Sequence, residues 1–244
     1  MKKLISVFLV LILTLAPMTG FAARDVAKEE ILAQNLKALG VFRGVSENEF
    51  DLLRAPTRVE ALVMLVRLLG KEAQATDEKN PHPFADVPKW ADDYVGYAYK
   101  NGLTNGVSET EFGTGDANIN TYLTFVLRAL GYSDIEGDFS YSEPFSLSQQ
   151  SGILPAIVDR ENFLRADCVT ISYVALASYM KNSNTTLSKK LISDGVFSEA
   201  DFLRYYDGDA VEYNATAKKE LDAEEIYKKC SPAVFYVEVY DKNS

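Results

Sequence analysis

Histidine is almost absent from this 244-residue chain, because His82 is the only one and it stands between two prolines. A Ser–His–Asp hydrolase needs an imidazole to carry a proton, and no Gly-x-Ser-x-Gly turn is present either. The two cysteines, Cys168 and Cys230, are too few for a disulfide framework. Two alternatives are left: one disulfide between them, or a buried free thiol at Cys168. No His/Cys group has zinc spacing and no EF-hand-like loop occurs. We therefore expect no metal, no cofactor and no catalytic site.

Positive charge is also scarce. The chain has 25 Lys and Arg against 35 Asp and Glu, which gives a formal net charge of −10. An acidic surface disfavours nucleic acid and anionic membrane as partners. Such a charge suits a soluble exported protein.

The N-terminus has the pattern of a secretory signal peptide. Two lysines precede an apolar run over residues 4–16, which Pro17 interrupts, and small residues follow up to Ala22. The run is short for a membrane span, although an uncleaved anchor is the alternative. We predict a signal peptide over residues 1–22 and no membrane association after its cleavage.

Two stretches of the chain nearly repeat each other. Residues 44–50 read GVSENEF and residues 106–112 read GVSETEF, so they differ at one position. Gly40 and Gly102 also correspond, as do the later R-x-L-G segments. A repeat of this length indicates copies of one supersecondary unit, each too small to bury its own apolar face. This pattern favours an interaction module over an enzyme.

Helical spacing predicts two helices in the first unit. Apolar residues recur at helical intervals over residues 25–39 and again in TRVEALVMLVRLLG. Thr57 and Glu60 form a capping box at the start of the second helix, and Gly70 ends it. Residues 71–83 are polar and indicate a linker.

The second unit begins PFADVPKWADDYVGYAYKNGL. Asp86 can cap the helix that Pro88 begins, and Trp90, Tyr94 and Ala98 recur on one helical face. A further apolar helix ending in RALG completes this unit.

A third, degraded unit follows. We predict its first helix within residues 144–151 and its second in LRADCVTISYVALASYM, with a short helix from Leu187 to Ile192. Further on, residues 220–230 have a helical pattern. Residues 233–240, AVFYVEVY, are typical of a strand.

These segments together resemble the S-layer homology repeat. FADVPKWADDYVGYAYKNGL carries the match in the second unit, PTRVEALVMLVRLLG in the first, and LRAD in the third. The resemblance implies a mainly α fold in which three helix–loop–helix repeats, residues 25–72, 82–134 and 138–197, pack as a pseudo-threefold bundle. The extension, residues 198–244, adds a short helix and a lone strand.

The resemblance also implies a function. Grooves between the units of this family bind secondary cell-wall polysaccharide, often pyruvylated, and hold exported proteins at the bacterial cell wall or surface without catalysis. The family's ligand contacts correspond to Arg58 and Glu60 in the first unit, Asp86 and Trp90 in the second, and Arg165 in the third. An arginine at a helix start suits a carboxylate, and an indole suits the apolar face of a sugar.

Most of these residues have a structural interpretation as well. Trp90 could be core packing, and Glu60 and Asp86 could serve only as helix caps. Arg58 is the strongest candidate, because the capping box should leave its side chain free. Ile119 stands where the second unit should have an arginine, so we expect at most two working grooves.

Two other functions remain open. The C-terminal AEEIYKKCSPAVFYVEVYD resembles the lead-in to exported trypsin-like serine proteases, so the chain could be the anchor half of a protease whose catalytic domain is absent. A purely structural role in a surface array is the third alternative.

Overall fold

The computed structural model describes residues 24–47 and 49–211, and their secondary structure is helical apart from isolated bridges. This confirms the mainly α prediction. The predicted leader, the helix at 220–230 and the strand at 233–240 lie outside the described residues. The described helices are α1 (Ala27–Ala38), α2 (Arg58–Leu68), α3 (Glu72–Glu78), η1 (Lys89–Ala91), α4 (Asp92–Lys100), α5 (Ile119–Ala129), α6 (Phe145–Gln150), α7 (Arg165–Ala175), α8 (Leu187–Ser193) and α9 (Glu199–Tyr205).

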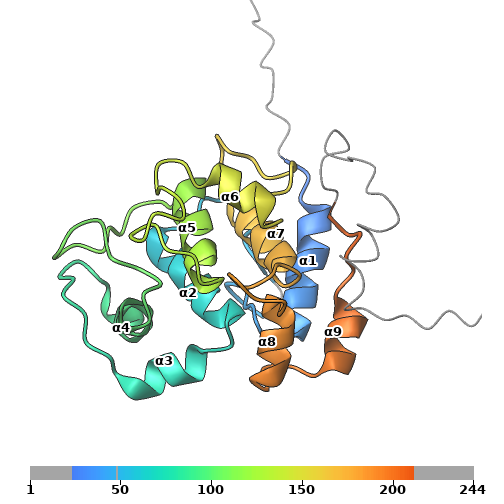
Figure 1. Ribbon diagram of the computed structural model, residues 1–244, viewed down its shortest axis with the longest axis horizontal. Helices are drawn as coiled ribbons and strands as arrows, with labels where there is room; N and C mark the ends of the chain where they lie inside the picture. Colours follow the sequence, from blue (N-terminus) through green and yellow to red (C-terminus); the bar gives the residue numbers. More distant parts are fainter. Residues whose placement is uncertain (1–23, 48, 212–244) are drawn as a thin grey trace, which may run out of the picture.

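Three successive helix–loop–helix pairs make up most of the bundle: α1 with α2, α4 with α5, and α6 with α7. The second helix of each pair is the more buried one, and every residue of α7 is buried. In Figure 1, α1 lies beside α7 and α9, while α3 and α4 lie on the far side of α2. The core therefore forms around α2, α5 and α7.

Local sequence signals explain where α2 begins and ends. The Thr57 hydroxyl accepts a hydrogen bond from the backbone N–H of Glu60, and the Glu60 carboxylate accepts one from the backbone N–H of Thr57. This capping box satisfies two N–H groups that the helix itself cannot pair. At the other end Gly70 takes a φ of 65°, a left-handed conformation that ends the helix.

Loops of one unit hold the helix starts of another. The backbone N–H of Arg58, in the first unit, donates to the carbonyl of Gly115 in the second at 2.8 Å. In the same way the backbone N–H of Arg165, in the third unit, donates to the carbonyl of Arg54 in the first at 2.9 Å. Each contact satisfies an N–H at a helix start. The same contact thus recurs between different pairs of units.

Two segments outside the three helix pairs differ from the sequence prediction or were not covered by it. Residues 71–83 were predicted to be a linker, but α3 forms within them and Ala75 is fully buried. Beyond the third unit, α9 packs against α1, and the Tyr173 ring stacks on Tyr206 at 4.8 Å between centroids. Residues 198–211 therefore pack on the bundle.

Candidate ligand site

Arg58 is buried at the first position of α2, and the prediction that its side chain is free is wrong. Only 8% of the residue is exposed. The guanidinium carbon lies 5.3 Å from the ring centroid of Phe112 and 5.1 Å from that of Phe125. Nη1 donates to Thr121 Oγ1 at 3.4 Å and Nη2 to the carbonyl of Gly106 at 3.5 Å. Both bonds are long, so the guanidinium is held mainly by the two aromatic faces.

The charge of Arg58 is poorly compensated. Its Nε is buried and has no hydrogen-bond partner among the described residues, and its side chain forms no ion pair with a described carboxylate. Burial lowers the pKa of Arg58, although the nearby Tyr141 hydroxyl opposes this effect. Burying an unpaired charge is costly. Arg58 is therefore a buried cation without a carboxylate partner among the described residues.

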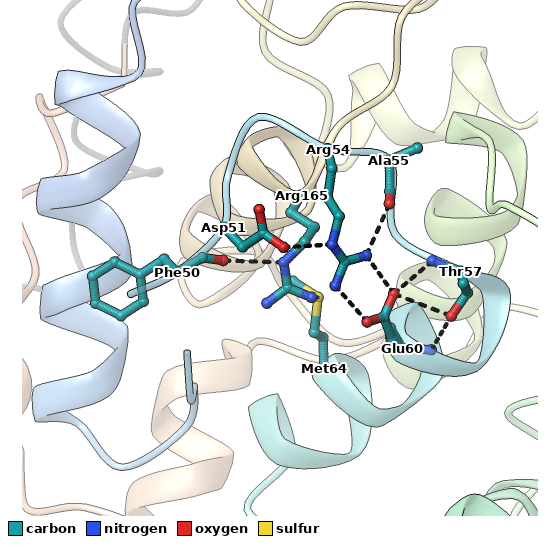
Figure 2. Close-up of polar contacts among 8 residues, drawn as sticks. All are labelled: Phe50, Asp51, Arg54, Ala55, Thr57, Glu60, Met64 and Arg165. Carbon is teal, nitrogen blue, oxygen red and sulfur yellow. Dashed lines mark hydrogen bonds and ion pairs between the residues drawn. The ribbon is translucent and has the colours of Figure 1, made fainter. Parts of the chain in front are cut away.

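Arg165 occupies the equivalent first position of α7 and is buried too, with 4% exposed. Its Nε donates to the carbonyl of Phe50 at 3.0 Å, and Nη1 contacts the sulfur of Met64 at 3.7 Å (Figure 2). Burial lowers the pKa of Arg165, and the charge of Glu60 partly opposes this. As at Arg58, this guanidinium donates its hydrogen bonds to uncharged acceptors.

Other arginines of the described chain with reduced exposure are paired. Arg24 binds Asp167 at 2.9 Å, and Arg128 binds Asp134 at 2.7 Å. Arg67 contacts Glu72 at 2.9 Å. The side chains of Arg67 and Arg128 are only 23% and 10% exposed.

Glu60 combines the predicted cap with an ion pair that the sequence analysis did not anticipate. Arg54 donates to both oxygens of the Glu60 carboxylate, at 2.8 and 2.6 Å, and also to Asp51 at 2.5 Å (Figure 2). The hydrogen bonds from Arg54 lower the pKa of Glu60 to about 2. Glu60 is thus ionised and held in place beside Arg165.

Asp86 does not cap the helix that follows it, contrary to expectation. Its carboxylate instead accepts the backbone N–H groups of Phe112 at 2.7 Å and Gly113 at 2.8 Å. It therefore fixes the loop that carries Phe112 and Gly106, both of which contact Arg58. Burial alone would raise the pKa of Asp86, but these N–H donors lower it.

Trp90 lies in η1 and is 59% exposed, so it is not a core residue. An open indole can stack on a sugar. Ile119, by contrast, is 3% exposed at the first position of α5 and offers no charge. The structure thus places a buried cation at two of the three equivalent helix starts.

Tyr141 was not predicted. Its hydroxyl lies 3.0 Å from Thr121 Oγ1, the oxygen that Arg58 contacts, and 43% of the residue is exposed. It lies in a polar stretch that matches no motif. Only its spacing from Phe139, equal to that of Asp86 from Phe84, could have drawn attention to it.

A cleft of about 610 Å³ lies elsewhere, at the C-terminal ends of α1 and α2. Its main polar groups converge on Glu72, which binds Arg43, Arg67 and the Tyr94 hydroxyl. Its cations are therefore neutralised within the protein. Among the described residues, no group of three or more His, Cys, Asp or Glu side chains could hold a metal ion. No described helix is long and apolar enough to cross a membrane.

Comparison with known proteins places this geometry in context. The S-layer homology domain matches residues 83–117. The chain is 33% identical to a cell surface protein of Thermoanaerobacter kivui over 58% of its own length and 20% of that protein's. It is 31% identical to an endoglucanase of a Bacillus species, over 42% of this chain and 10% of the endoglucanase. It is 30% identical to the middle cell wall protein of Brevibacillus brevis, over 54% of this chain and 14% of that protein.

The chain therefore spans a fifth or less of the length of these relatives. None of the three is named as a protease. The resemblance to a protease lead-in is not supported by them, and its residues lie outside the described part of the chain. Residues 83–117 thus match the S-layer homology domain, and the chain around them is similar to segments of much longer cell-surface and cell-wall proteins.

Proposed function

We propose that this protein is a non-catalytic anchoring module that binds an acidic cell-wall polysaccharide through Arg58 and Arg165. The protein is secreted and resides at the bacterial cell surface or cell wall, in keeping with its relatives. Asp86 holds the loop beside Arg58, Glu60 lies beside Arg165, and Trp90 is available to stack on sugar. A pyruvyl ketal, which carries a carboxylate on a sugar, fits the cationic sites.

One observation carries the proposal: the two buried guanidiniums have no carboxylate partner among the described residues. Other arginines of reduced exposure, such as Arg24 and Arg128, do have one. An unpaired buried charge lowers stability, so its presence at two equivalent helix starts calls for a ligand. A carboxylate bound there would gain charge-assisted hydrogen bonds in a site with little competing water.

The geometry supports binding without catalysis. The described carboxylates at these sites are committed within the protein: Asp51 and Glu60 accept hydrogen bonds from Arg54, and Asp86 accepts two backbone N–H groups. Hydrolysis of a glycoside requires a pair of carboxyl groups flanking the bond. The similarity to an endoglucanase covers a tenth of that enzyme, so we assign its activity to that protein alone.

Co-sedimentation with purified Brevibacillus brevis walls tests this function. The walls are used intact and after extraction of their polysaccharide. We expect the parent protein to sediment with intact walls and to stay in solution with extracted ones. Arg58→Met and Arg165→Met should each weaken binding about 10-fold or more, the range for hydrogen bonds to charged groups.

Arg67→Met is the control, because Arg67 lies in the last turn of α2, away from the helix start, and its charge is already paired with Glu72. It should bind walls like the parent. Equal recovery of the parent on intact and extracted walls would falsify the proposal. Undiminished binding by the double variant of Arg58 and Arg165 would overturn it as well.

A further inference from the structure

Three units of the bundle meet at one hydroxyl group. Thr121 Oγ1, in the second unit, accepts a hydrogen bond from Arg58 Nη1 of the first unit at 3.4 Å. It also lies 3.0 Å from the Tyr141 hydroxyl. Tyr141 comes from the segment ahead of α6, in the third unit. The chain thus brings an aromatic residue to the buried cation from a distant part of the sequence.

The backbone of Tyr141 is fixed. Asn120 Nδ2 donates to the carbonyls of Tyr141 at 3.0 Å and Ser142 at 3.2 Å. A turn in which Ser140 pairs with Glu143 closes the same segment. Nevertheless 43% of Tyr141 remains exposed. A tyrosine that is held at its backbone and its hydroxyl, and yet is partly exposed, is suited to contact a ligand.

The direction of the hydrogen bonds can be worked out from the partners. Asn118 Oδ1 can only accept, and the Thr121 hydroxyl donates to it at 3.0 Å. The single proton of Thr121 is therefore committed, so Tyr141 donates in its contact with Thr121. The Tyr141 oxygen has two lone pairs, and a side-chain hydrogen bond with Arg58 engages one of them, so one acceptor position remains. An acceptor thus lies beside the donors of Arg58.

We propose that Tyr141 is the sugar-recognition residue of the Arg58 site, an inference that rests on the function proposed above. Arg58 binds the acidic substituent of the polysaccharide. The Tyr141 oxygen accepts a hydrogen bond from a hydroxyl of the same sugar residue, and the ring packs on the apolar face of that sugar. The site therefore selects an acidic sugar over a simple anion.

The surroundings of Arg165 differ in kind. Figure 2 shows Asp51, Arg54 and Glu60 around it, where the Arg58 site has Thr121 and Tyr141. The charges of Asp51 and Glu60 partly offset that of Arg165, so an anion is attracted less strongly there than at Arg58. Recognition of a particular sugar is thus expected at Arg58 more than at Arg165.

The test measures one site at a time. All variants are made in an Arg165→Met background, and soluble polysaccharide released from Brevibacillus brevis walls is titrated by calorimetry. Tyr141→Phe keeps the ring and removes the oxygen, and we expect binding about 3–10-fold weaker. Tyr141→Ala removes both, and we expect a loss of about 10–100-fold. Tyr179→Ala is the matched control, because Tyr179 is 42% exposed but lies beyond the C-terminal end of α7.

The outcomes separate the two proposals. If Arg58→Met abolishes binding while Tyr141→Ala binds like the background, this inference is overturned and the anchoring function stands. If Tyr179→Ala weakens binding as much as Tyr141→Ala does, the inference also fails. Because Tyr141→Phe preserves the packing of the ring, its loss of affinity supports recognition even if Tyr141→Ala is poorly folded.

Discussion

Arg54 and Glu60 form a bidentate ion pair, with Nη1–Oε2 at 2.8 Å and Nη2–Oε1 at 2.6 Å (Figure 2). The same carboxylate accepts the backbone N–H of Thr57 at the start of α2. Glu60 therefore joins the loop of the first unit to the helix that presents Arg58. It stabilises the site, and its contribution depends on its charge.

The first prediction concerns pH. Hydrogen bonds from Arg54 lower the pKa of Glu60 to about 2, below its ordinary value of 4.5. Because the folded-state pKa is depressed, the stabilisation is complete above the ordinary pKa and is lost as pH falls from about 4.5 toward 2. We expect Glu60→Gln to lower the free energy of unfolding by about 1–2 kcal/mol at pH 7, after allowance for solvent screening of a partly exposed pair.

Urea denaturation of parent and Glu60→Gln at several pH values measures this difference. It should shrink steadily below about pH 4.5 and approach zero near pH 2. The exposed Glu30→Gln on α1 is the control and should show a small difference throughout. A difference that stays constant down to pH 2 would contradict a role for the ionised pair.

The second prediction concerns the cost of a buried charge. Arg58→Met should leave the free energy of unfolding within about 1 kcal/mol of the parent, or raise it, because an apolar side chain of similar length suits the space between Phe112 and Phe125. Arg58→Ala should lower it by about 1–3 kcal/mol through lost packing. Chemical denaturation at pH 7 compares the two. If Arg58→Met lowers the free energy of unfolding more than Arg58→Ala does, the charge of Arg58 itself supports the fold.

The third prediction tests whether neighbouring atoms lie so close to Gly106, in the loop beside Arg58, that only glycine fits there. Gly102 and Gly106 have nearly equal φ values, 69° and 71°. A Cβ at Gly106 would lie 2.4 Å from the Phe84 ring and 2.5 Å from the carbonyl oxygen of Glu111, whereas nothing lies within 4 Å at Gly102. Gly102→Ala should cost about 1 kcal/mol for the left-handed backbone alone. Gly106→Ala should cost at least about 2 kcal/mol more. Equal losses in thermal unfolding would show that the loop can adjust.

The fourth prediction concerns the anchoring of that loop by Asp86. Asp86→Ala removes the acceptor of two backbone N–H groups, at Phe112 and Gly113. We expect it to lower the free energy of unfolding by about 1–3 kcal/mol and to weaken wall binding, because Gly106 and Phe112 would no longer be held against Arg58. Hydrogen exchange of the two amides should rise. Unchanged protection at both positions would refute this assignment.

Local signals predicted much of the fold. The capping box at Thr57 and Glu60 and the helix-ending Gly70 follow from neighbours along the chain, so they could be inferred from sequence alone. In contrast, α3 was missed because its residues are mostly polar and show no apolar periodicity. Ala75 is the one residue of α3 whose side chain is buried in the protein.

The sequence indicated candidate residues for the site but not the surroundings of those residues. Arg58 was assigned to the site, yet its burial depends on Phe112, Phe125 and Gly106, which lie in another unit. The same holds for Asp86, whose partners are a loop and not its own helix. Helix-start rules treat each segment alone, so they cannot show which surface a neighbouring unit will cover. Roles in binding for Glu60, Asp86, Trp90 and the two arginines stay predictions.

The contact between Arg165 and Phe50 joins residues 115 positions apart, and it has a consequence for how an exported chain folds. The first unit precedes α7 in the chain, so the surface that receives Arg165 stays uncovered until α7 has been synthesised. Such long-range contacts delay folding, because the intervening chain must be ordered before they form. The packing around Arg165 therefore forms only once α7 is present. A fragment comprising residues 24–134 should accordingly show helical circular dichroism but a broad, weakly cooperative unfolding transition.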